Sequence, residues 1–119
     1  MKYLTEIEQI VKALDLEPHP EGGFFKETYR STGMINQENL GNQYQGDRNY
    51  STGIYFLLTS ENFSAFHRIK QDEMWHFYDG SPICIHSISP EGVYNKTLLG
   101  RNIASGEKPQ FVVKGGDWF

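Results

Sequence analysis

The chain has 119 residues, of which 38% are hydrophobic and 22% are charged, the composition of one globular domain and not of a disordered segment. Fifteen acidic residues against 11 basic ones give a formal net charge of -4. Because no basic run is dense enough to follow a phosphate backbone, nucleic acid is excluded as an expected partner. The single cysteine, Cys84, excludes an intramolecular disulfide, and no Cys/His array indicates structural zinc.

The N-terminal residues 1–6 are acidic and amphipathic, whereas a signal peptide would be apolar there. The longest apolar run, residues 54–58, is far shorter than the ~20 residues that span a bilayer. We therefore expect a cytoplasmic protein without a membrane partner.

A helix is predicted over about residues 4–15, where apolar residues recur every three or four positions. Thr5 and Glu8 suit a capping box, in which each side chain bonds a free backbone amide at the helix start. Pro18 and Pro20 are expected to stop the helix, because proline lacks the amide donor and restricts the residue before it.

From residue 22 onward, short apolar and alternating segments separated by Gly, Pro, Asp and Asn predict strands. Seven are expected, at residues 24–31, 51–59, 63–69, 74–78, 83–89, 93–99 and 111–119. Residues 33–50 are polar without a clear period and are predicted to form a long loop, which serves as a lid or an interface arm or is merely mobile. The prediction is a single mainly β domain over residues 1–119, with one short N-terminal helix and a β region from about residue 22.

In the first long strand, alternation puts Phe25, Glu27 and Tyr29 on one face and the even-numbered residues 24–30 on the other. Two arginines, Arg30 and Arg48, are candidates for binding an anionic ligand group through the guanidinium fork. The alternative is that each arginine pairs structurally with a carboxylate, for which the candidates are Glu21, Glu27 and Glu73.

Polar and ionisable residues gather between residues 64 and 80, where His67 and His76 account for two of the four histidines. Imidazole and carboxylate together can bind a transition metal or carry a proton. The alternative is that both histidines are ordinary strand residues. The other two, His19 and His86, have no partner that the sequence identifies, and we interpret them as structural or surface residues.

His67, Glu73 and Gly80 stand at the spacing of the first cupin motif, in which a His-x-His pair, a Glu and a closing Gly occupy adjacent strands. Further blocks at residues 18–31, 48 with 51–58, 66–69 and 72–77 closely resemble the cupin family that is labelled a domain of unknown function, in the RmlC-like class. The resemblance covers nearly the whole chain. It implies a jelly-roll barrel, usually a homodimer, with a pocket inside the barrel, and it brings no established reaction.

The sequence departs from the cupin pattern at the metal ligands. Ile69 takes the place of the second histidine, and Phe119 stands where the second motif has the third histidine. Only His67 and Glu73 match, and strand alternation puts His76 on the face opposite Glu73. Two ligands fall short of the three or four of a stable zinc or iron site, so the cofactor is unknown and a divalent metal is disfavoured.

Family members continue beyond the position of residue 119 with strands that help to close the barrel. The expected barrel therefore lacks its C-terminal strands: either the sequence is a truncated version, or another subunit covers the open edge in a homodimer.

Our first functional hypothesis is a cupin that binds a small polar or sugar-like molecule inside the barrel. The candidate pocket residues are His67, Glu73, Tyr55, Trp75, Arg30 and Arg48, whose aromatic members offer a stacking surface or belong to the core. The second is an epimerase or isomerase with His67 as general base, because His67 resembles by position the base of related deoxysugar epimerases. The third is a metal-dependent oxidoreductase using His67 and Glu73. Whether the protein is an enzyme is left open.

Overall fold

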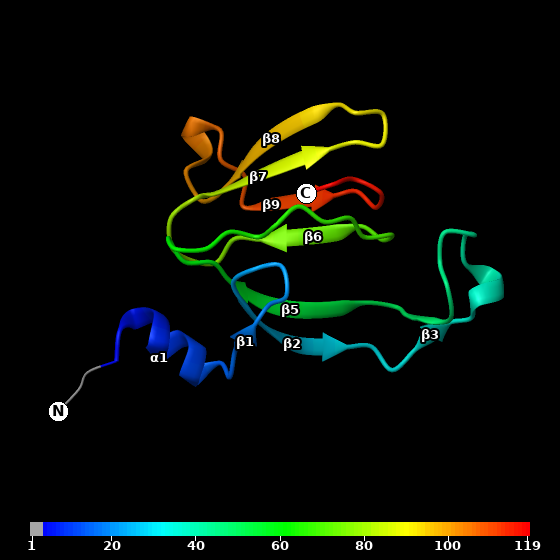
Figure 1. Cartoon of the computed structure of the whole chain (residues 1–119), viewed down its shortest axis with the longest axis horizontal. Coiled ribbons are helices and arrows are strands. Elements are labelled where there is room, and N and C mark those ends of the chain that lie inside the picture. The colour runs from blue at the N-terminus through cyan, green and yellow to red at the C-terminus, as the bar shows by residue number, and fades with distance from the viewer. Residues whose placement is uncertain (1–3) are drawn as a thin grey trace. The chain divides into compact units, whose positions relative to one another are not determined.

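The computed structural model describes residues 4–119 and divides the chain into two compact units, Met1–Ala65 and Phe66–Phe119. Residues 1–3, part of the segment that we compared with a signal peptide, lie outside the described residues. The first unit holds α1 (Glu6–Ala13), β1 (Glu17–Pro18), β2 (Phe24–Arg30), β3 (Met34–Ile35), η1 (Gln37–Asn39), β4 (Arg48–Asn49) and β5 (Thr52–Leu57) (Figure 1). The second unit holds β6 (Glu73–His76), β7 (Ile83–Ile88), β8 (Tyr94–Leu99), η2 (Ile103–Ser105) and β9 (Gln110–Val113). The described residues are thus mainly β with one short α-helix, as predicted.

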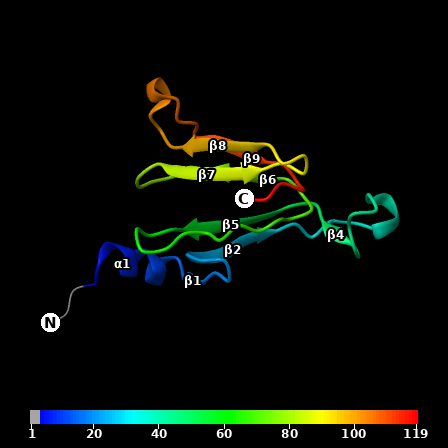
Figure 2. The ribbon, with the colours of Figure 1, turned by 45° about the horizontal axis from the view of Figure 1, so that its top comes forward.

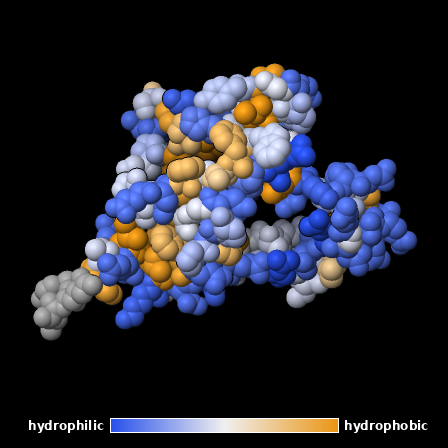
Figure 3. Space-filling view, in the orientation of Figure 1, coloured by the Kyte–Doolittle hydropathy of each residue, from blue (hydrophilic) through white to orange (hydrophobic). Residues whose placement is uncertain are grey.

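The helix α1 begins as the sequence predicted but ends for a different reason. Thr5 is the N-cap, and its Oγ1 accepts a hydrogen bond from the Glu8 amide at 3.1 Å. The helix ends at Ala13, well before the two prolines, and Asp15 has a left-handed φ of 54° that no regular helix allows. The expectation that Pro18 and Pro20 stop the helix was therefore wrong. No residue of α1 is fully buried, and apolar surface shows at its position in Figure 3.

The main sheet of the first unit has the antiparallel order β1-β2-β5, and both ribbon views show β2 beside β5 (Figures 1 and 2). Its register pairs Glu27 with Ile54 but Tyr29 with Gly53, so one extra residue forms a bulge in β2. Residues after the bulge therefore change faces. Arg30 shares a face with Glu27, whereas Tyr29 shares one with Lys26, and this corrects the strict alternation predicted for the strand.

The polar segment 33–50 contains its own short ladder, although the sequence predicted a long loop. Met34 pairs with Asn49 and Ile35 with Arg48, which joins β3 to β4, and η1 lies between them. Polar side chains also hold this segment together, since the Gln37 backbone amide donates a hydrogen bond to Asp47 Oδ1 at 2.9 Å. Hydrogen bonds of this kind leave no hydrophobic period in the sequence, which is why the ladder was missed.

In the second unit, β6 pairs with β9 and β7 with β8, both antiparallel. The predicted strand 63–69 is wrong: around Arg68 there is an isolated bridge to Trp118, beside which His67 and Phe119 exchange two backbone hydrogen bonds of 2.9 Å. The predicted strand 111–119 is interrupted after Val113 by a turn with a left-handed glycine at residue 116.

The second unit contains an apolar core. Its buried members are Ile85, Leu99, Val113 and Phe119, and five partly buried residues pack against them, namely Ile69, Trp75, Phe77, Ile83 and Phe111. Strand pairing within residues 4–119 gives four separate sheets, so the closed barrel of the prediction is not formed by these ladders. Across the same residues, no helix has the length and apolar character needed to cross a membrane.

Candidate functional site

Strand β6 presents two chemically different faces. Glu73 and Trp75 are half-buried, whereas Met74 and His76 are exposed. Glu73 lies directly opposite the buried Val113 of β9, which places its side chain on the core side of the ladder. The predicted separation of His76 from Glu73 is therefore confirmed.

The two inward polar side chains of β6 have atoms that are closed off from solvent. These atoms are Oε2 of Glu73 and Nε1 of Trp75. The Trp75 ring packs against the apolar core and lies opposite Phe111, so Trp75 serves as a core residue whatever else it does. A carboxylate in such surroundings forms stronger hydrogen bonds than one in water.

His67 lies at the edge of the same core. Its backbone pairs with that of Phe119, and the two ring centroids are 4.4 Å apart with an interplanar angle of 46°. The cupin resemblance placed Phe119 at a ligand position, and the structure indeed brings this residue against His67. The imidazole therefore has an apolar neighbour in place of a second imidazole, in surroundings that suit a ligand contact or a single proton transfer.

The donor set does not fit the metal site that the cupin resemblance implies. Among residues 4–119, no three His, Cys, Asp or Glu side chains are grouped closely enough to hold a metal ion. The substitutions at Ile69 and Phe119 account for this, because they replace two of the four expected ligands with hydrocarbon. His67 and Glu73 remain as an incomplete pair.

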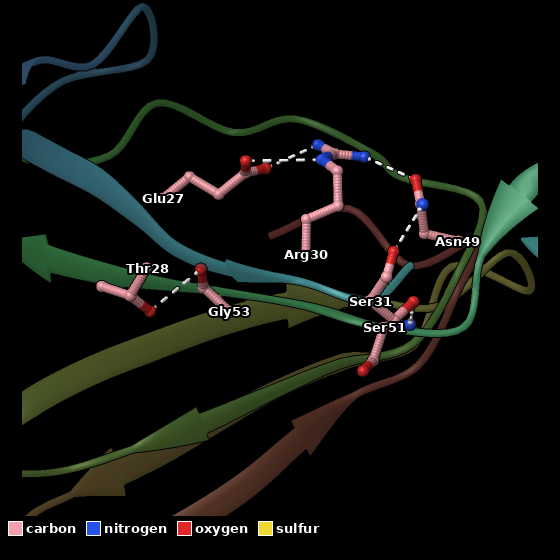
Figure 4. A network of polar contacts seen from close by, with 7 residues as sticks. All are labelled: Glu27, Thr28, Arg30, Ser31, Asn49, Ser51 and Gly53. Atoms are coloured by element: carbon pink, nitrogen blue, oxygen red, sulfur yellow. Dashed lines mark hydrogen bonds and ion pairs between the residues drawn. The ribbon is translucent and has the colours of Figure 1, made fainter. Parts of the chain in front are cut away.

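Arg30 is held in a polar network within the first unit (Figure 4). Its guanidinium bonds both carboxylate oxygens of Glu27 and donates to Asn49 Oδ1 at 2.8 Å. The hydrogen bonds and then the charge of Glu27 raise the pKa of Arg30. This is the structural pairing that the sequence left open for Arg30. Tyr55, which pairs with Lys26, lies on the opposite face of the β2–β5 ladder, so the ladder does not bring these two candidates together.

Arg48 differs from Arg30 in its surroundings. It is half-buried on β4, and its guanidinium carbon lies 5.6 Å from the centre of the Tyr44 ring. Its Nε atom is enclosed and makes no hydrogen bond within residues 4–119. Because a buried donor without an acceptor costs free energy, Arg48 is the better placed of the two arginines to bind an added anionic group.

The sequence interpretation missed partners for both remaining histidines. His86 bridges Cys84 and Tyr94, with its Nε2 3.4 Å from Cys84 Sγ and its Nδ1 2.7 Å from Tyr94 Oη. The available signal was the Cys-x-His spacing, which puts both side chains on one strand face. His19 accepts a hydrogen bond at Nδ1 from the Glu21 amide at 3.0 Å, as expected for a structural residue.

Comparison with known proteins gives the family. Residues 8–119 match the family described as Cupin superfamily (DUF985). The uncharacterized protein YML079W of Saccharomyces cerevisiae is 31% identical over 118 residues, which cover 94% of this chain and 58% of the yeast protein. The chain belongs to this cupin family, and it spans less than two thirds of the yeast relative.

Two solved structures resemble the chain. A hypothetical protein from Leishmania major is 36% identical with a TM-score of 0.82, over 93% of this chain and 66% of that one. Protein SO0799 from Shewanella oneidensis is 38% identical with a TM-score of 0.83, over 97% and 67% of the two chains. They support the cupin-like fold, and the absence of C-terminal strands stays a prediction.

Proposed function

We propose that this cupin binds a small polar or sugar-like molecule. The observation that carries the proposal is the inward placement of Glu73 on β6, with its Oε2 enclosed beside the apolar core of the second unit. Buried carboxylates are rare in apolar surroundings, and concave sites in folded proteins combine an apolar wall with few polar groups of this kind. His67 supplies a second polar group next to the same core through its contact with Phe119.

The chemistry of the ligand follows from these side chains. A carboxylate accepts hydrogen bonds from hydroxyl groups, as a sugar or polyol offers, and an imidazole both donates and accepts. Two other candidates, Arg48 and Tyr55, belong to the first unit, where Tyr55 is 41% exposed on its strand face, and their part in binding stays a prediction. Arg30, also in the first unit, has no part in this proposal, because Glu27 and Asn49 already occupy its guanidinium.

The test is a thermal-shift screen of neutral sugars, polyols and hydroxy acids, followed by calorimetric titration of each hit. Glu73→Gln should weaken binding ~10-fold or more, because hydrogen bonds to a charged group contribute about 1.5–3 kcal/mol. Glu91→Gln is the matched control, since Glu91 is exposed in the turn between β7 and β8. Equal affinity of the Glu73→Gln variant and the wild type for the hit would overturn the proposal.

An epimerase or isomerase is the second candidate function, favoured by the contact of the His67 imidazole with the Phe119 ring at the edge of the apolar core. A base of this kind removes an acidic C–H proton from the bound substrate. His67→Ala should then abolish turnover of the hit while retaining its binding, with His76→Ala, exposed on the other face of β6, as control. If the His67→Ala variant kept both binding and turnover, this role would be excluded. An oxidoreductase that depends on a metal has no support from the donor set described above.

The homodimer implied by the cupin resemblance is also a proposal. On the outward face of the β6–β9 ladder, Met74 is 53% exposed opposite Val112 at 36%, an apolar pair that a second copy could cover. Light scattering at micromolar concentration should give twice the chain mass. A monomer that persists as concentration rises would contradict the dimer.

A further inference from the structure

Three reactive or titratable side chains form a hydrogen-bonded row on the second unit, away from the candidate ligand site. Cys84 Sγ lies 3.4 Å from His86 Nε2, and His86 Nδ1 lies 2.7 Å from Tyr94 Oη. The His86 and Tyr94 rings stack with centroids 5.9 Å apart and an interplanar angle of 15°. The imidazole is thus fixed in orientation on both of its nitrogens.

The strands place this row on the outer face of the β7–β8 ladder. Cys84 and His86 alternate with the buried Ile85 and Ser87, so their side chains point away from the core. Tyr94 reaches this face from β8 and is 54% exposed, and Cys84 is partly exposed. The thiol is therefore accessible to a small reagent, while the ladder holds its neighbours in place.

A cation also belongs to the same face. Lys96 lies directly opposite His86 in the ladder and is exposed, between Tyr94 and Leu98 on β8. A thiolate is stabilised by a nearby cation and by a hydrogen bond from an imidazole, and the thiolate is the nucleophilic form of cysteine. An activated nucleophile has an adjacent base that takes its proton and a third group that orients the base.

We propose that Cys84 is a reactive thiol that forms mixed disulfides with disulfide compounds of low molecular weight, with His86 as its base and Tyr94 as a positioning residue. When Nδ1–H of His86 donates to Tyr94 Oη, Nε2 is free to accept the Cys84 proton. The thiolate then attacks one sulfur of the disulfide, and a new S–S bond forms as the old one breaks. The departing thiolate takes the proton from His86, so Cys84 is oxidised while the reagent is reduced and no further oxidant is required.

The first experiment measures the second-order rate of the reduced full chain with 4,4′-dithiodipyridine, a neutral disulfide whose released thione is followed by absorbance. One cysteine per chain makes the rate that of Cys84 alone. His86→Ala should slow the reaction ~10-fold or more, because the thiol loses the base that takes its proton, and added imidazole should restore part of the rate. The matched control is His76→Ala, which should react as the wild type does. His76 is an exposed histidine of β6 whose ring stacks on that of Tyr78.

A second variant tests the orienting role and guards against misfolding of His86→Ala. Tyr94→Phe keeps the ring that stacks on His86 and removes only its hydroxyl. We expect a smaller decrease in rate, together with a changed tautomer balance of His86 in nitrogen NMR, which a purely structural role would not alter. Incubation with glutathione disulfide should add one glutathionyl group per chain by mass spectrometry, and Cys84→Ser should add none.

Two results would overturn the proposal: rates of His86→Ala and Tyr94→Phe equal to that of the wild type, or a folded wild type that reacts more slowly than the chain unfolded in urea. Because the row faces away from the core, Cys84→Ser should leave binding of any hit from the ligand screen unchanged. The two proposals can therefore fail separately.

Discussion

The second unit buries Ile85, Leu99, Val113 and Phe119 around one core, whereas in the described part of the first unit Leu16 is the buried hydrophobic residue. The first unit instead relies on ladder hydrogen bonds and on a polar network that includes the buried Ser31 and its neighbour Asn49. Apolar packing therefore holds His67 and Glu73 in place, whereas hydrogen-bonded strands hold Arg30 and Arg48. We expect the two units to respond differently to substitution.

The largest effect should come from Leu99→Ala. Leu99 is 1% exposed in the core of the second unit, and loss of a buried leucine side chain leaves a cavity that costs about 2–5 kcal/mol. Urea denaturation followed by circular dichroism gives the change in the free energy of unfolding. Leu98→Ala is the matched control, because Leu98 is 39% exposed on the other face of β8.

Leu16→Ala is the counterpart in the first unit and should cost less, near the lower limit of about 2 kcal/mol for this substitution. Leu16 is 8% exposed and is not part of a larger buried cluster among the described residues. The same denaturation measurement applies. A loss as large as that of Leu99→Ala would break the comparison between the units.

Thr5→Ala should cost about 1 kcal/mol, because the Glu8 amide loses the hydroxyl that caps α1. The loss should appear as reduced helical signal at temperatures below the main transition. Thr32→Ala, a change of the same kind at an exposed loop residue, should have no such effect. An unchanged helical signal would mean that the cap does not hold the helix end.

The smallest effect should come from Glu27→Gln. Its ion pair with Arg30 is exposed and screened by water, so only a slight loss of stability is expected, and that loss should shrink as salt is added. The variant should also lower the pKa of Arg30, since Glu27 raises it. Glu38→Gln serves as control, and an equal, salt-independent loss in both variants would show that the network contributes nothing specific.

Much of the architecture could be predicted from sequence, because periodicity records burial. The capped helix, the six strands of four residues or more and the outward position of His76 follow from such patterns. The β3–β4 ladder and the bulge in β2 could not be predicted, since both depend on which backbone groups pair across the sheet. The same limit applies to the Cys84, His86 and Tyr94 row, which requires the register of two strands. The assignment of His67 and Glu73 came from the cupin motif, and their function stays a proposal.

The bulge in β2 also makes the register of this strand chemically significant. If Thr28 paired regularly with Gly53, with no bulge, Arg30 would move past Thr52 and every side chain after Thr28 would turn over. Arg30 would then leave Glu27 and Asn49 and point to the side of Tyr55, where it would be free to meet an anion. A shift of one residue in the register of β2 would thus exchange a structural arginine for a binding one without any change in side-chain type.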